Sequence, residues 1–206
     1  ILASKYESFE ICQFLIDNSY INFDKLLTIP LELSVLNEKV FQMIFKKCTV
    51  NQKQMFLSLS LYPAIENRNI KLVDYLLKEK APYDDALLIS VRNSDLKMVK
   101  IILKYHKDPI FINKKSVDGT VFSIAVKNND LAMGELLLSI PGININFKEC
   151  IYNPFIIAVT NLNIDFINQM LNYFLKNQTI QTGAFNVLQE SLYILVDMNS
   201  KENNWK

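Results

Sequence analysis

The chain of 206 residues has little of what enzyme active sites need. Its one histidine, His106, stands in no motif that supplies a nucleophile or an orienting group, so His-dependent catalysis is not expected. The three cysteines, Cys12, Cys48 and Cys150, lack the spacing of a metal site or a redox pair. We therefore predict no catalytic residue, no metal ion and no cofactor, and we interpret each cysteine as a small buried hydrophobic residue.

Glycine is also scarce, with only four residues in the chain. These glycines are isolated from one another, which excludes the Gly-rich loops that bind phosphate groups. Gly134 falls within an expected helix, where glycine costs about 1 kcal/mol relative to alanine. We interpret it as a place where two helices approach closely.

Neither sign of charge dominates, because 22 basic and 21 acidic residues are interspersed and the net charge is +1. Nucleic-acid-binding domains usually carry clustered excess lysine and arginine, so we expect no nucleic-acid partner. The longest apolar stretch, residues 55–65, is too short to cross a bilayer, and we expect no membrane association. Free thiols are typical of a reducing compartment, which makes the cytoplasm the expected location.

One short pattern occurs four times along the chain. It consists of Asn, one intervening residue, a second Asn or Asp, and an apolar residue, and its copies begin at Asn67, Asn93, Asn128 and Asn161. Repetition of one unit along a chain is the signature of a repeat protein. A small residue stands three positions before each copy, and these residues are Ala64, Ser90, Ala125 and Ala158.

Each copy of the pattern is typical of a tight turn between two short helices. Around the first copy, apolar residues recur at helical spacing both before the turn, at Ala64 and Ile65, and after it, at Leu76. We expect Asn67 to end the first helix in the left-handed conformation that usually requires glycine. Asn69 then caps the second helix. The same template predicts about six such repeats, with a seventh cut short at the end of the chain.

The segments between the helix pairs are expected to form two kinds of loop: projecting fingers with an extended segment, and shorter bare loops. Residues 143–146, Ile-Asn-Ile-Asn, alternate as a short extended segment does, and residues 110–113 and 20–22 occupy the same place in other copies. Asp118-Gly119-Thr120 predicts a turn. Residues 78–85 are too few to form a finger, and we expect a bare loop there.

We expect four aromatic residues of the helices to lie in the core: Phe14, Phe41, Phe45 and Tyr75.

These features resemble the ankyrin-repeat family, whose unit of about 33 residues combines a β-turn finger with two helices. Residues 118–125 stand where the family's unit begins, Leu136-Leu137-Leu138 stands where it has three leucines, and Asn153-Pro154 keeps its proline at a helix start. Tetratricopeptide and HEAT repeats lack the alternating segment. The resemblance implies an all-α fold, an ankyrin-type α-solenoid of about six helix-turn-helix repeats with short β-turn fingers, in which residues 1–206 form a single array.

The resemblance also implies a non-enzymatic scaffold that binds another protein through its concave face and finger loops. We expect this chain to be a monomer. Tyr152 and Phe147 are the stronger candidates for contact, because aromatic anchors dominate interfaces. The full set of residues expected to contact the partner is Lys114, Lys115, Asp118, Phe147, Lys148, Glu149, Tyr152 and Asn153.

Other interpretations stay open. Because the chain begins with Ile1 rather than Met, we expect a segment of a longer protein. One alternative is therefore a regulatory or targeting ankyrin module of a multidomain enzyme whose catalytic domain lies outside residues 1–206. A purely structural spacer is another. Binding to membranes or nucleic acid is disfavoured by the balanced charge.

Overall fold

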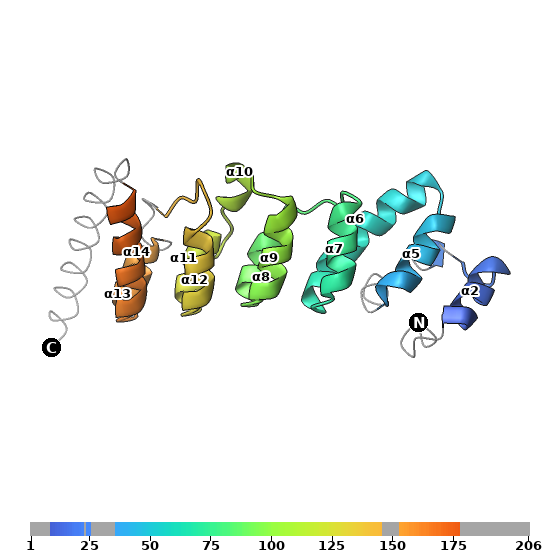
Figure 1. The fold of residues 1–206 in the computed structure, drawn as a ribbon, viewed down its shortest axis with the longest axis horizontal. Coiled ribbons are helices and arrows are strands. Elements are labelled where there is room, and N and C mark those ends of the chain that lie inside the picture. The colour runs from blue at the N-terminus through green and yellow to red at the C-terminus, as the bar shows by residue number, and fades with distance from the viewer. Residues whose placement is uncertain (1–8, 23, 26–35, 146–152, 178–206) are drawn as a thin grey trace. The chain divides into compact units, whose positions relative to one another are not determined.

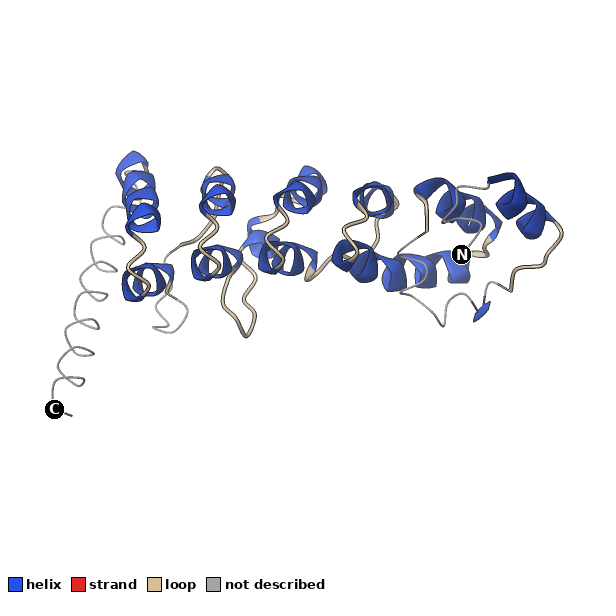
Figure 2. Cartoon of the chain, turned by 90° about the horizontal axis from the view of Figure 1, so that it is seen from below, coloured by secondary structure: helices blue, strands red, loops and turns tan. Residues whose placement is uncertain are grey.

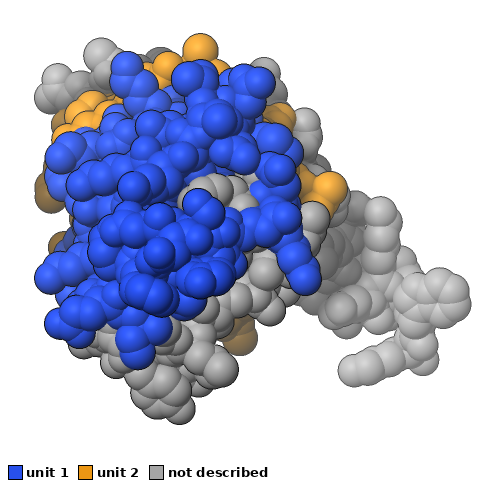
Figure 3. All heavy atoms as spheres, turned by 90° about the vertical axis from the view of Figure 1, so that its right-hand side faces the viewer, with its two compact units in different colours: residues 1–106 blue, residues 107–206 orange. Residues whose placement is uncertain are grey.

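The computed structural model describes residues 9–22, 24–25, 36–145 and 153–177, and most of these residues are helical (Figure 1). These ranges contain no β-strand, although Ser116 and Gly119 form an isolated antiparallel bridge. The predicted all-α fold is confirmed. The chain divides into two compact units, residues 1–106 and 107–206, which Figure 3 shows in different colours. That residues 1–206 form a single array stays a prediction.

Unit 1 contains two packed helix pairs, α6 with α7 and α8 with α9, preceded by two further helices. Helix α6 also packs on α8, and α7 on α9, so the first helices of the pairs form one layer and the second helices another (Figure 2). Helix α5 extends the layer of second helices, because it packs against α7. The helices described in unit 1 are α2 (Phe9–Asp17), α5 (Glu38–Lys47), α6 (Val50–Glu66), α7 (Ile70–Lys78), α8 (Ala86–Arg92) and α9 (Leu96–Tyr105).

The core of unit 1 is an aromatic cluster around Phe41, which is 1% exposed. Its ring lies 6.0 Å from the ring centres of Phe45 and Phe56 and 6.1 Å from that of Tyr75. The prediction that Phe14 belongs to the core is wrong, because this side chain is 60% exposed. Helix α2 buries Cys12 and Ile16, and a residue two positions after Cys12 lies on the opposite side of a helix.

Unit 2 repeats the paired arrangement. Helix α11 packs on α12 and α13 packs on α14, while α11 also contacts α13 and α12 contacts α14. A one-turn helix precedes them. The helices described in unit 2 are α10 (Pro109–Ile112), α11 (Val121–Lys127), α12 (Leu131–Leu138), α13 (Pro154–Thr160) and α14 (Ile164–Lys176). The fragment of a seventh repeat expected near the C-terminus lies outside the described residues.

The turn between paired helices is the same in all four pairs. Between α6 and α7, the Asn69 amide donates to the Ala64 carbonyl at 2.9 Å, and the Arg68 amide donates to the Ile65 carbonyl at 3.0 Å. These two bonds define a Schellman motif. The predicted small residue therefore supplies the carbonyl that closes each turn. Its side chain is buried between helices, since Ala64, Ser90, Ala125 and Ala158 are each 0% exposed.

The predicted caps of the second helices are confirmed. The Asn69 side chain accepts a hydrogen bond from the Leu72 amide, and Asp95 accepts one from the Met98 amide. Asp130 and Asn163 cap α12 and α14 in the same way. Each second helix thus begins at the residue after a side chain that satisfies one of its free backbone donors.

The prediction that Asn67 adopts the left-handed conformation is wrong by one residue. Asn67 has φ −80°, whereas the next residue, Arg68, has φ +55°. In a Schellman motif the left-handed residue follows the C-cap. Asn67 is that C-cap, and its side-chain amide donates to the Pro63 carbonyl at 3.0 Å. The left-handed residues of the four turns are Arg68, Ser94, Asn129 and Leu162.

Replacing Leu162 with glycine is expected to stabilise unit 2 by about 0.5–1 kcal/mol. Leu162 has φ +54°, a conformation that costs a residue with a Cβ atom about 1–2 kcal/mol, partly offset by the greater chain entropy of glycine. Its side chain is 83% exposed, so little packing is lost. Chemical denaturation measures the change. As a control, Thr160→Gly at the last residue of α13 should destabilise, because it also removes the hydroxyl that donates to the Ile156 carbonyl. A loss of stability in Leu162→Gly would contradict the assignment.

The loops agree with the predictions at two places and differ at a third. A loop connects α7 to α8, as expected for residues 78–85. Ser116 and Gly119 close the turn that Asp118-Gly119-Thr120 predicts, with φ +103° at Gly119. The extended segment expected over residues 110–113 is wrong, because residues 109–112 form helix α10. Local capping explains this: the Asp108 side chain accepts from the Ile110 amide, and proline occupies the first helical position.

Candidate partner-binding surface

Helix α10 begins the loop region in which three of the predicted contact residues lie. Its single turn buries Ile112, which is 0% exposed, and leaves Ile110 84% exposed. The two side chains differ in exposure because residues two positions apart point to different sides of a helix. The result is an anchored turn that presents one large apolar side chain to solvent.

The β-turn after α10 carries Val117 and Asp118 at its tip. The Ser116 amide donates to the Gly119 carbonyl at 2.9 Å, and the Gly119 amide donates back at 3.1 Å. The Ser116 hydroxyl donates to the same Gly119 carbonyl at 3.0 Å. Thr120 then caps α11 by accepting from the Ser123 amide. The turn is therefore held at its base, and Val117 at its tip is 84% exposed.

Asn113 ties this region to the loop that follows α12. Its side-chain amide donates to the Gly142 carbonyl at 2.8 Å, and its side-chain oxygen accepts from the Asn144 amide at 2.7 Å. The Tyr173 hydroxyl donates to the Ile143 carbonyl at 3.3 Å, and burial raises the pKa of this phenol, which keeps it protonated. The side chain of Asn113, which follows α10, and that of Tyr173 on α14 thus hold the loop after α12 in place.

The structure places Lys114, Lys115 and Asp118 on this one loop. Lys115 is exposed, whereas Lys114 and Asp118 are half-buried. The first helix after them offers little additional surface, because α11 buries six consecutive residues, 121–126. Within the described part of unit 2, the contact surface expected from the sequence is therefore made mainly by the finger.

The other predicted contact residues are less informative. Phe147, Lys148, Glu149 and Tyr152 lie outside the described residues. Asn153 is only 3% exposed, and its side chain accepts from the Phe155 and Ile156 amides at the start of α13. Its amide side chain serves as a helix cap and offers almost no surface to a partner.

The sequence does not predict the exposure of two apolar residues of the finger. The alternating pattern places Ile110 in an extended segment, and no pattern distinguishes Val117. The only available signal is their position beside proline, lysine and aspartate, which indicates a loop. We define the finger surface as Ile110, Lys114, Lys115, Val117 and Asp118.

Among the described residues, no group of three or more His, Cys, Asp or Glu side chains is placed to hold a metal ion. His106 ends α9 and stacks on the Tyr83 ring, and burial lowers the pKa of its imidazole. Cys12 and Cys48 are free and buried, as predicted, while Cys150 lies outside the described residues. No helix in the searched part of the chain is long and apolar enough to span a membrane.

Helix pairs that share one recurring turn, pack in two layers and carry a loop finger define a helical-repeat protein. Residues 61–149 match the family model of ankyrin repeats, in three copies. Residues 61–149 therefore consist of ankyrin repeats, and the predicted resemblance to this family is confirmed for that part of the chain. No curated protein matches the chain. Ankyrin repeats are generally modules for protein–protein interaction and are typically non-catalytic.

Proposed function

We propose that the chain is a non-enzymatic scaffold module, a cytoplasmic monomer, that binds another protein through the finger surface of unit 2. The observation that carries this proposal is the exposure of Ile110 on α10 and of Val117 on the β-turn that follows, each 84% exposed, in segments that hydrogen bonds hold in place. Burying such side chains in a partner contributes about 1.5–3 kcal/mol each. A rigid loop loses little entropy on binding, which favours affinity.

The charged members of the surface supply specificity. Lys114, Lys115 and Asp118 lie within eight residues of Ile110 in the sequence, on the same finger. Charged residues around an apolar centre suppress wrong partners and set the rate of encounter more than the affinity. The supported mode of binding is thus an apolar contact with a charged rim.

A photo-cross-linking amino acid placed at position 110 or 117 in the native cell tests the location of the surface. We expect adducts with the same partner from both positions and none from position 175. Leu175 lies on α14 of the same unit and is 70% exposed, so it controls for exposure. Adducts formed equally at position 175 would contradict the proposal.

With the cross-linked partner identified, the double variant Ile110→Asp/Val117→Asp is expected to lose about 2–4 kcal/mol of binding free energy, because two apolar contacts are replaced by charges. Isothermal titration calorimetry measures this loss. Leu175→Asp makes the same kind of change on another exposed face and should leave affinity unchanged. Undiminished binding by the double variant would discard the finger surface.

A further inference from the structure

Three neighbouring helices of unit 1 carry lysines at the same two positions. The pairs are Lys39 and Lys46 on α5, Lys71 and Lys78 on α7, and Lys97 and Lys104 on α9, and each pair is seven residues apart. Seven residues are nearly two helical turns, so the two lysines of a pair lie on one side of their helix about 10 Å apart. All six are exposed.

The three helices lie side by side in the layer of second helices. Helix α5 packs on α7, and α7 packs on α9. The Asn69 side-chain amide donates to the Leu36 carbonyl at 3.0 Å, which joins the starts of α5 and α7. Packed helices lie about 8–10 Å apart. The six lysines therefore form a grid with similar spacing in both directions, which we call the lysine grid.

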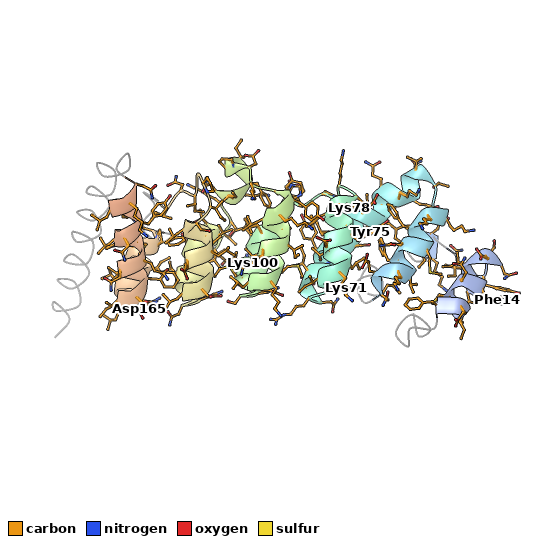
Figure 4. The ribbon with its side chains drawn as sticks, viewed as in Figure 1. Phe14, Lys71, Tyr75, Lys78, Lys100 and Asp165 are labelled. Carbon is orange, nitrogen blue, oxygen red and sulfur yellow. The ribbon has the colours of Figure 1, made fainter. Side chains whose placement is uncertain are left out.

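Figure 4 shows part of this grid. Lys71 and Lys78 lie toward opposite ends of α7, with Tyr75 between them, and Lys100 lies on the adjoining helix α9. Lys100 is exposed and adds a further positive charge among the six. The labelled lysines thus lie on the neighbouring helices α7 and α9 of unit 1, although the net charge of the whole chain is only +1.

Most of these lysines form no ion pair in the described ranges, although the carboxylates of Glu38 and Glu79 lie near Tyr75. Within the residues that the structure describes, six of the seven form no ion pair: Lys39, Lys46, Lys71, Lys78, Lys97 and Lys100. Lys104 is the exception, because its ammonium group contacts the Asp74 carboxylate at 3.0 Å. Lys39 lies over the Phe9 ring, 5.5 Å from its centre. The face therefore has a net positive charge that an acidic partner would neutralise.

The repeat itself does not require these lysines. The lysines stand two and nine residues after the N-cap of their helix. In unit 2, these positions are occupied by Ala132 and Ser139 after the N-cap of α12, and by Asp165 and Asn172 after the N-cap of α14. Second helices therefore fold with neutral or acidic residues there. The lysines of unit 1 are a property of its surface and not of the helix packing.

The surrounding side chains distinguish between anionic partners. The exposed large hydrophobic residues of unit 1 in the described ranges lie outside α5, α7 and α9, so this face has nothing to insert into a bilayer. The Tyr75 ring packs edge-on against Phe41 and Phe45, so it is unavailable for stacking on a nucleic-acid base. These features favour a protein partner.

We propose that the lysine grid is a second docking surface, and that it binds an acidic helical segment of a partner protein. In an α-helix, Glu or Asp residues seven positions apart recur on one side about 10 Å apart, which matches the spacing of the lysines. The surface lies in unit 1 and recognises charge, so this proposal is independent of the apolar contact at the finger surface.

The probe for a test is a 21-residue helical peptide with glutamates repeated every seven residues along one side. We expect the full chain to bind it at 150 mM salt, with fluorescence anisotropy as the measurement. Lys71→Gln/Lys78→Gln/Lys97→Gln/Lys100→Gln should weaken binding about tenfold or more, because each exposed charge pair contributes a modest factor. The affinity of this variant should also depend less on salt.

The matched control is Lys127→Gln/Lys176→Gln, which removes exposed lysines from unit 2 and should bind like the original chain. An isomeric peptide with its glutamates spread around the helix should bind more weakly. Equal binding of the two peptides would overturn the proposed match between the glutamate spacing and the lysine spacing. Phosphatidylserine vesicles or duplex DNA that bind more tightly than the peptide would overturn the choice of partner. Unchanged binding by the fourfold variant, or no binding by the original chain, would overturn the site.

Discussion

The variant Phe41→Ala is expected to destabilise unit 1 by about 3–5 kcal/mol, the cost of deleting a large aromatic side chain from a core. Phe41 is 1% exposed and contacts three other aromatic rings, those of Phe45, Phe56 and Tyr75. These rings come from α5, α6 and α7, so the cavity would lie where three helices meet. Because the surrounding helices are fixed by their caps, the site is poorly able to collapse around the cavity.

The measurement is hydrogen exchange of the amides in α5 and α7, which reports on unit 1 directly. Protection is expected to fall by at least a hundredfold, since each 1.4 kcal/mol corresponds to a factor of ten. Phe14→Ala is the matched control, because the same atoms are removed from a side chain that is 60% exposed. Equal losses of protection in the two variants would show that the aromatic cluster is not the core of unit 1.

The variant Gly134→Ala is expected to destabilise unit 2 by about 1–3 kcal/mol, the usual range for overpacking. On helix propensity alone, the change would stabilise α12 by about 1 kcal/mol. A Cβ atom at this position would overlap the ring edge of Phe166 and lie 2.9 Å from the Gln169 side-chain oxygen. Phe166 is 0% exposed, so its ring has no free space to occupy. The steric effect therefore outweighs the propensity.

A double-mutant cycle with Phe166→Leu tests this cause. Leucine lacks the ring edge, so Gly134→Ala should cost less in the Phe166→Leu background, with a coupling energy of about 1 kcal/mol or more. Urea denaturation followed by circular dichroism measures all four chains. Additive effects, or a gain in stability from Gly134→Ala alone, would show that α12 and α14 do not approach closely at this glycine.

Much of the local structure was predictable because it depends on residues close in sequence. The caps at Asn69 and Asp130 need only a polar side chain three residues before a free amide, and the sequence places one there. The close contact at Gly134 was likewise predictable, because glycine inside a helix requires a reason. The ankyrin fold follows from the recurrence of these local signals.

Other features depend on which atoms meet in three dimensions. The left-handed residue of each turn is the one after the C-cap, whichever residue stands there, because two backbone hydrogen bonds determine the position and the side chain does not. Leu162 and Arg68 therefore adopt a conformation that their own preferences oppose. Asn153 likewise looked like a surface residue but is buried at the start of α13.

The repeated unit, its helix faces and its caps follow from residues close together along the chain, since the period of the apolar residues and the capping side chains act within about a turn of helix. Which residues face solvent together depends instead on how the helices pack. Lys71 and Lys97 are 26 residues apart in the sequence, and they lie on one surface only because α7 packs on α9. Packing between helices, which no local pattern encodes, therefore creates the surfaces that we propose as docking sites.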